Sequence, residues 1–162
     1  MKWGAVTGAA KYRVFYKTSG GSWTKAGDTT GTSLTVKSLK SGTKYTFTVR
    51  CLSADGKSYT STFDATGKSI TYIAQPAVSS VANGAAGVTV KWGAVNGAAR
   101  CRVFYKTSGG SWTKAGDTTA TSLTVKGLKK GTTYTFTVRC LSADGKSYIS
   151  SYDAEGVPLT VK

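Results

Sequence analysis

The stretch Tyr45-Thr46-Phe47-Thr48-Val49-Arg50-Cys51 carries the clearest structural signal in the chain. Its apolar side chains alternate with Thr and Arg along the whole stretch. Successive residues of a β-strand point to opposite faces of the sheet, so this pattern predicts a strand with one face in a hydrophobic core. The stretch occurs a second time as Tyr134–Cys140, without any change.

This recurrence extends over the whole chain. Trp3 and Trp23 are followed by Trp92 and Trp112 at the same offset of 89 residues, and the residues around them are nearly the same. A repeat of that period in a chain of 162 residues indicates two small domains rather than one large domain. We therefore expect one domain at residues 1–73 and another at 74–162.

The segments around the strong strand are also typical of β-structure. Short alternating runs are separated by turn residues, and no segment has helical periodicity over a useful length. In the first domain the expected strands cover residues 2–6, 12–16, 23–26, 32–36, 45–51, 58–63 and 70–73. Runs of this length and spacing predict an all-β fold, with each domain an antiparallel β-sandwich.

Several residues stand in the pattern of a known family. They are Trp3, the run Tyr12-x-Val14-x-Tyr16, the run Ser33–Val36 and the corner Leu39, Gly42, Thr43 and Tyr45, which recurs as Leu128, Gly131, Thr132 and Tyr134. With this pattern the chain resembles tandem fibronectin type III domains, and it is most similar to repeat arrays of secreted and cell-surface proteins of gut Firmicutes. The resemblance implies seven-stranded, immunoglobulin-like sandwiches and an extracellular localisation. It implies no activity, because this fold hosts adhesion, spacing and ligand binding alike.

The two domains differ in how completely they fit this pattern. Residues 75–81 and 87–92 supply the first two strands of the second domain. About seventeen residues equivalent to Ala74–Val90 have no counterpart before Trp3. The first domain is therefore expected to lack its first strand and part of its second, which would expose backbone donors and apolar side chains.

A strand from another chain would complete such a domain by β-augmentation. The C-terminal segment Pro158-Leu159-Thr160-Val161-Lys162 resembles Gly87–Lys91, which makes Leu159, Thr160 and Val161 candidate strand donors. Donation from each chain to the next would build a head-to-tail filament. In the alternative interpretation, this tail is the last strand of its own domain.

The chain is strongly basic, with 22 Lys and Arg residues, 7 acidic residues and a net charge of +15. Such a charge favours acidic partners, among them anionic glycans and cell-wall polymers. The basic residues are spread singly along the expected strands and form no dense run of the kind that favours nucleic-acid binding. We therefore expect no nucleic-acid partner, and the lack of a long apolar stretch predicts no membrane insertion.

Three cysteines are present, and no histidine. Cys51 and Cys140 are equivalent, whereas Cys101 takes the place of Tyr12. The resemblance implies neighbouring strands in which Cys101 and Cys140 face each other, which leaves two alternatives: a disulfide bond, or two free thiols that fill the volume of the missing ring. The cysteine spacing makes no zinc site, and no metal or cofactor is expected.

Groups suited to catalysis are scarce. The recurring Asp residues stand next to turn residues and are interpreted as turn formers. The Gly-Lys-Ser triplets at 56–58, 67–69 and 145–147 lack the earlier Gly of a phosphate-binding loop. The sequence therefore predicts that the protein is not an enzyme.

Aromatic side chains near basic residues are the best binding candidates. They are Trp23, Tyr59 and Phe63, with Trp112, Tyr148 and Tyr152 in the second copy, beside Lys57 and Lys146. Exposed rings of this kind stack on sugars or contact a protein partner, but they also cap the ends of a small core. We expect a non-catalytic structural or spacer module of a bacterial surface or secreted protein, with adhesion or binding of carbohydrate and cell-wall polymers as the alternative.

Overall fold

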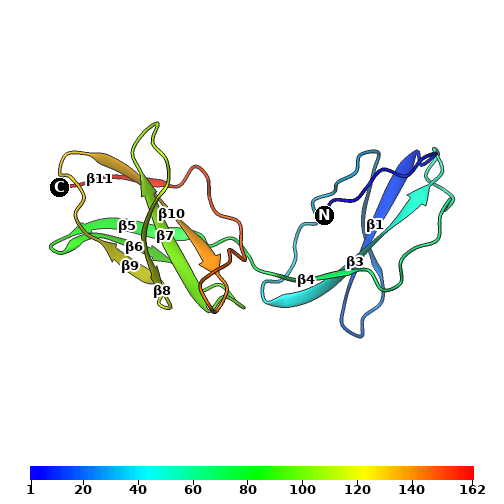
Figure 1. Ribbon diagram of the computed structural model, residues 1–162, viewed down its shortest axis with the longest axis horizontal. Coiled ribbons are helices and arrows are strands. Elements are labelled where there is room, and N and C mark those ends of the chain that lie inside the picture. Colours follow the sequence, from blue (N-terminus) through cyan, green and yellow to red (C-terminus); the bar gives the residue numbers. More distant parts are fainter. The chain divides into compact units, whose positions relative to one another are not determined.

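The computed structural model describes residues 1–162, which divide into two compact units, Met1–Tyr72 and Ile73–Lys162. Both units consist of antiparallel strands and loops, as Figure 1 shows. The first unit contains β1 (Lys11–Thr18), β2 (Thr24–Thr29), β3 (Thr43–Leu52) and β4 (Lys68–Tyr72). The second contains β5 (Val78–Gly84), β6 (Gly87–Trp92), β7 (Arg100–Lys106), β8 (Thr113–Thr118), β9 (Ser122–Val125), β10 (Thr133–Leu141) and β11 (Val157–Thr160). The chain has no helix that is long and apolar enough to cross a membrane.

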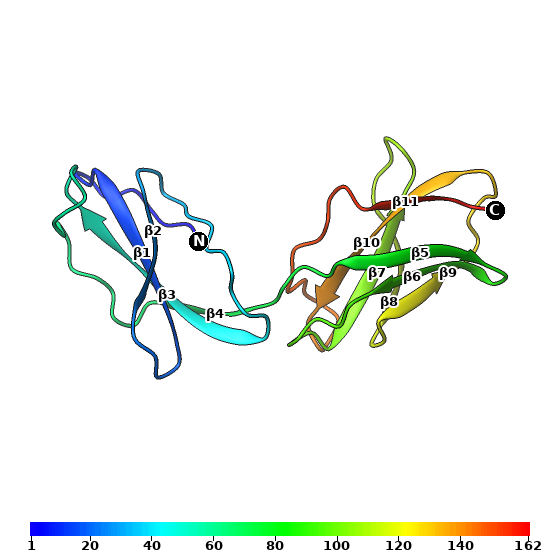
Figure 2. The ribbon, with the colours of Figure 1, turned by 180° about the vertical axis from the view of Figure 1, so that it is seen from behind.

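The second unit is a complete sandwich of two sheets (Figure 2). One sheet has the strand order β11-β10-β7-β8, and the other has the order β5-β6-β9. Their inner faces enclose a core that includes Val88, Val90, Trp92, Val103, Phe136 and Val138. The expected all-β sandwich is therefore confirmed, and its core comes from the alternate apolar residues of β6, β7 and β10.

The first unit has one full sheet, in the order β2-β1-β3-β4, and only a remnant of the second layer. That remnant is a single bridge between Lys2 and Ser33, with hydrogen bonds from Trp3 N to Thr32 O and from Leu34 N to Met1 O. The expectation of an incomplete first domain is thus confirmed. The expected strand at residues 32–36 does not form beyond this bridge, because strand β6, which pairs with β9 in the second unit, has no counterpart of similar length.

Residues that a second sheet would cover are open in the first unit. Val49 and Val36 are half-buried, whereas their equivalents Val138 and Val125 are buried. Ile70 on β4 is 51% exposed. Val36 and Ile70, together with neighbouring side chains, form an apolar groove of about 390 Å³, lined by Met1, Lys2, Thr35, Val36, Leu39, Phe47, Lys68, Ile70 and Tyr72.

Strand β3 contains the stretch that carries the strongest sequence signal, and its position follows from that alternation. It pairs with β1 along eight residue pairs, from Lys11↔Leu52 to Thr18↔Tyr45. The corner before β3 is closed by Tyr45, whose hydroxyl accepts a hydrogen bond from Lys40 N at 3.0 Å. Gly42 has φ of 76°, a left-handed conformation that favours glycine at this corner.

The segment at residues 58–63 is a loop, whereas the C-terminal tail contains a strand. The expected strand at residues 58–63 does not form: only Tyr59 bridges to Leu52, and Ser61 Oγ instead accepts from Cys51 N at 2.9 Å. In the C-terminal tail, β11 pairs with β10, and Val161 lies in the core of its own unit. Of the candidate donor residues, Leu159 and Thr160 thus belong to the last strand of the second unit, and Val161 directly follows it.

The junction between the units has hardly any free chain. Strand β4 ends at Tyr72, and the next residue, Ile73, is 7% exposed and belongs to the core of the second unit. The second unit therefore begins at Ile73, one residue earlier than the expected domain boundary.

Candidate ligand-binding surface

The outward faces of β1 and β3 carry large basic and aromatic side chains. On β1, Arg13, Phe15 and Lys17 alternate with residues that face the core. The register places Arg13 directly opposite Arg50 of β3. Two like charges at opposed positions destabilise a sheet, so this face needs groups that separate or neutralise them.

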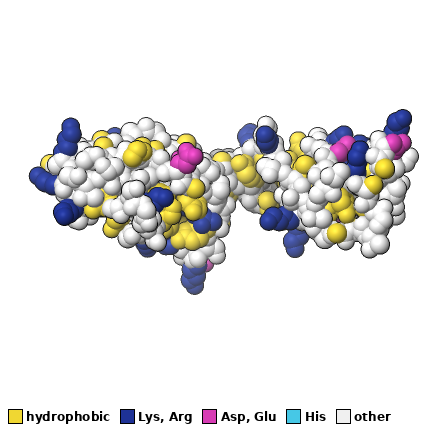
Figure 3. Space-filling view, turned by 90° about the horizontal axis from the view of Figure 1, so that it is seen from above, with side chains coloured by type: hydrophobic (Ala, Val, Ile, Leu, Met, Phe, Trp, Pro, Cys, Tyr) yellow, Lys and Arg dark blue, Asp and Glu magenta, His cyan; other side chains and the backbone are white.

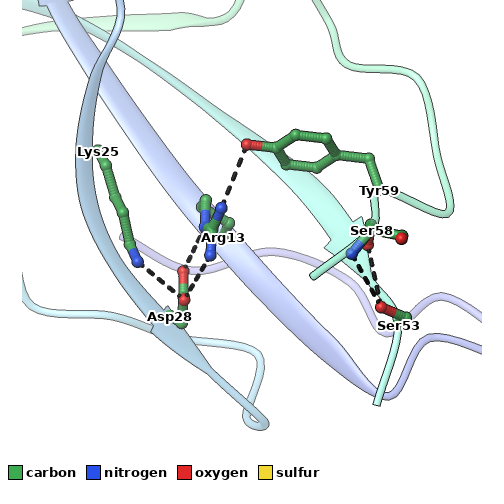
Figure 4. A network of polar contacts seen from close by, with 6 residues as sticks. All are labelled: Arg13, Lys25, Asp28, Ser53, Ser58 and Tyr59. Atoms are coloured by element: carbon green, nitrogen blue, oxygen red, sulfur yellow. Dashed lines mark hydrogen bonds and ion pairs between the residues drawn. The ribbon is translucent and has the colours of Figure 1, made fainter. Parts of the chain in front are cut away.

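A carboxylate neutralises the first of these arginines (Figure 4). Asp28 on β2 accepts from Arg13 Nε at 2.7 Å and Nη2 at 2.8 Å, and from Lys25 Nζ at 2.9 Å. Arg13 Nη1 also donates to the Tyr59 hydroxyl at 3.3 Å. The hydrogen bonds from Arg13 hold the pKa of Asp28 at about 2, below its ordinary value, so the carboxylate stays ionised and the network stays intact at neutral pH.

Aromatic rings stabilise the second arginine. The Arg50 guanidinium lies 3.6 Å from the centre of the Tyr59 ring and 5.5 Å from that of Phe63. Phe63 in turn meets Trp23 edge to face, with ring centres 6.2 Å apart. Lys17 Nζ lies 4.6 Å above the Trp23 ring. Distances of this size are those of cation–π contacts. We call this set, Lys17, Trp23, Phe63, Arg50, Tyr59 and Arg13, the first cation–aromatic row.

The second unit repeats the arrangement with the same order of groups. The second cation–aromatic row consists of Lys106, Trp112, Tyr152, Arg139, Tyr148 and Arg102. Asp117 accepts from Arg102 at 2.6 and 2.8 Å, as Asp28 does from Arg13. The space-filling view shows hydrophobic side chains at the surface with Lys and Arg near them and few acidic groups (Figure 3). A surface with this composition suits an anionic ligand that also has apolar faces.

Each row contains a small hollow between its rings. The first hollow, of about 200 Å³, is lined by Phe15, Trp23, Thr48, Arg50, Tyr59 and Phe63. The second hollow, of about 120 Å³, is lined by Phe104, Trp112, Thr137, Arg139 and Tyr152. The rings are accessible from solvent, since Tyr59, Phe63 and Tyr148 are each at least 40% exposed.

The structure brings together all six aromatic residues that the sequence singled out, three in each row. It does not bring Lys57 or Lys146 into the rows, because both lie in the turn after the long strand and make no ion pair or ring contact. The Lys and Arg residues of the rows are not among the binding candidates predicted from the sequence. Arg13 and Lys17 were detectable in the sequence, because they alternate with Tyr12, Val14 and Tyr16 and must therefore face outward.

The cysteines of the second unit face each other. Cys101 and Cys140 are paired across β7 and β10, and their Sγ atoms are 3.8 Å apart as free thiols. The hydrogen bond between these two buried thiols lowers the pKa of Cys101 to about 7 and raises that of Cys140. Cys51 is paired with Tyr12 and has no sulfur neighbour in its own unit.

Comparison with known proteins agrees with this architecture. The fibronectin type III domain model matches residues 2–66 and 74–156. The chain therefore belongs to the fibronectin type III family, with two tandem domains, as the sequence pattern predicts.

Individual proteins and solved structures match the chain at low sequence identity. Exoglucanase B of Cellulomonas fimi is 34% identical over 130 residues, which are 75% of this chain and 12% of that protein. The chain thus spans about one eighth of the length of this relative. Among solved structures, a two-domain fibronectin type III segment of chicken tenascin has a TM-score of 0.47 at 20% identity and covers 97% of this chain and 87% of that one. The FN1-FN3 domains of chicken CNTN1 have a TM-score of 0.46 at 16% identity, with 96% and 55% covered.

Proposed function

We propose that the chain is a non-catalytic structural module that acts as a spacer in an extracellular protein. The observation that carries this proposal is the junction, where the last residue of β4, Tyr72, is followed directly by the core residue Ile73. A junction without Gly-rich or Ser-rich residues restricts bending far more than a flexible linker does. Two domains joined in this way would hold apart any domains that lie before and after them in the same protein.

The family and the matched relative support this role. Fibronectin type III domains host many functions without chemistry of their own, so the fold itself assigns no reaction. The match to one eighth of an exoglucanase supports a place as an accessory part of an extracellular protein. We propose an extracellular or cell-surface localisation on the same grounds.

Small-angle X-ray scattering tests the spacer role. We expect the distribution of maximum dimensions of the full chain to be narrow, and to broaden clearly when six Gly and Ser residues are inserted between Tyr72 and Ile73. The reason is that the inserted residues restore the free rotation that the short junction denies. A wild-type distribution as broad as that of the insertion variant would contradict the proposal.

Head-to-tail assembly is a more specific form of the structural role. The apolar groove of the first unit, with the exposed Ile70, supports it, because an added strand would cover this surface. Donation of Leu159–Val161 would require β11 to leave β10, which weakens the second unit. Small-angle scattering over a wide range of protein concentrations tests this assembly. A solution mass that rises with concentration would support it, and a constant monomer mass would reject it.

We propose binding of anionic polysaccharides as a second candidate function, favoured by the two cation–aromatic rows. The rows offer exposed rings for the apolar faces of sugars and cations for their acidic groups. We expect the chain to be retarded in native gels that contain polygalacturonate, and the variant Tyr59→Ala/Tyr148→Ala to be retarded much less. If both proteins are folded and are retarded equally, the rings of Tyr59 and Tyr148 do not contribute to binding.

A further inference from the structure

The two hollows differ at one buried hydroxyl group. In the second hollow, Thr137 Oγ1 donates to the carbonyl oxygen of Asp153 at 2.7 Å. In the first hollow, Oγ1 of the equivalent Thr48 is buried and has no hydrogen-bond partner. Thr48 is only 4% exposed, and it is one of the residues that line the first hollow. A buried hydroxyl without a partner is costly, so a ligand that supplies one gains affinity.

The first hollow also has positive charge that no carboxylate neutralises. Arg50 donates from Nε and Nη2 to the carbonyl oxygen of Ser61 at 3.3 and 3.1 Å, which leaves Nη1 without a protein partner. Lys17, above Trp23, forms no ion pair. The acid of this face, Asp28, is already held by Arg13 and Lys25. A guanidinium with a free N–H at the edge of a hollow is suited to a carboxylate.

The walls and the size of the first hollow restrict the ligand further. Trp23 and Phe63 meet edge to face and present apolar ring surface. The volume of about 200 Å³ is below the roughly 300–1,000 Å³ of pockets for drug-sized ligands, so it suits a single ring. A six-membered sugar ring with one apolar face, several hydroxyls and one carboxylate meets all these conditions.

We infer that the first hollow binds one hexuronate unit of an acidic polysaccharide. Its pyranose ring packs against Trp23 and Phe63, and its carboxylate accepts from Arg50 Nη1. One of its hydroxyls pairs with Thr48 Oγ1 once the rings that cover this atom move aside. The second hollow is not an equivalent site, because the hydroxyl of Thr137 is already bonded and the volume is smaller. This inference rests on the second candidate function, and it adds that only one of the two rows recognises an individual sugar unit.

Titration of the full chain with trigalacturonate tests the inference, with cellotriose as the neutral probe and binding followed by calorimetry. We expect one site per chain and at least tenfold weaker binding of cellotriose. Thr48→Val is expected to weaken trigalacturonate binding about tenfold, the effect of losing one hydrogen bond to a sugar hydroxyl. Arg50→Gln should weaken it at least as much. The matched substitution Thr137→Val in the second unit should leave the affinity unchanged, because the Thr137 hydroxyl is already bonded to the Asp153 carbonyl oxygen.

The outcomes separate the inference from the function on which it rests. Two equivalent sites, or equal effects of Thr48→Val and Thr137→Val, would overturn the inference while glycan binding stands. Equal affinity for cellotriose would overturn the role of the carboxylate. No binding of trigalacturonate, together with no retardation in polygalacturonate gels, would overturn both. Folding of each variant is checked by the dispersion of its amide NMR spectrum, and Thr48→Val removes only a hydroxyl that has no partner.

Discussion

Phe136→Ala is expected to lower the free energy of unfolding of the second unit by about 3–5 kcal/mol, as fully buried Phe residues do when truncated. Phe136 is completely buried between the two sheets, in the same core as Val88 and Val90. Its removal would leave a cavity that the surrounding strands cannot fill. Because a small domain has about 5–15 kcal/mol of stability, this change would consume much of it. Hydrogen exchange of the full chain, read separately for each unit in increasing urea, measures the effect.

The repeat provides a matched control for this substitution. Phe47 is the equivalent residue, but it lines the apolar groove and is 6% exposed. Its removal enlarges a groove that is already open to solvent. We therefore expect Phe47→Ala to lower the free energy of unfolding of the first unit by about half as much as Phe136→Ala lowers that of the second. Equal losses of stability in the two units would contradict the view that the first unit has an open core.

Oxidation is expected to join Cys101 to Cys140 and to stabilise the second unit by about 2–4 kcal/mol, the usual effect of a bond that closes a loop of this order. The two residues are separated by 39 positions in sequence, are paired across β7 and β10, and have Sγ atoms 3.8 Å apart. The small movement that a bond needs is available to side chains on paired strands. Intact mass after treatment with diamide should fall by two hydrogens, and the unfolding midpoint of the second unit should rise.

The variant Cys101→Tyr is the matched control, because it restores the residue that the first unit has at Tyr12. It should show no mass change under the same treatment, because Cys140 then lacks the thiol that faces it and Cys51 is the only cysteine of its own unit. A dimer linked through Cys51, or no oxidation of the wild type, would contradict this prediction.

Much of the fold is predictable from local pattern, but pairing is not local. The run Thr-Ser-Leu-Thr-Val occurs at residues 32–36 and again at 121–125, with the same sequence. Only the second copy forms a strand, β9, because β6 is present beside it to exchange backbone hydrogen bonds with it. Alternation therefore indicates that a segment can be a strand, and the neighbouring chain decides whether it becomes one.

The candidate site likewise has a part that follows from local sequence and a part that depends on strand pairing. The aromatic residues are predictable, because in both copies they follow an Asp-Gly turn or a Gly-Gly loop. Nearness in sequence indicates Lys57 as the neighbouring cation, whereas the register of β1 and β3 places Arg13 and Arg50 opposite each other. The unpartnered hydroxyl of Thr48 gave no sequence signal, because the equivalent Thr137 is the same residue type in the same motif.

The junction at Tyr72 and Ile73 also determines how the protein would respond to pulling. A stretching force would reach the first unit along β4 and the second unit along the segment that leads into β5, with no slack to take up the load. In the first unit, β4 is held to β3 by a ladder of five residue pairs, from Thr43↔Tyr72 to Phe47↔Lys68, so a force applied at Tyr72 loads this ladder directly. A chain that is anchored at both ends would thus bear tension through the hydrogen bonds that join β3 and β4.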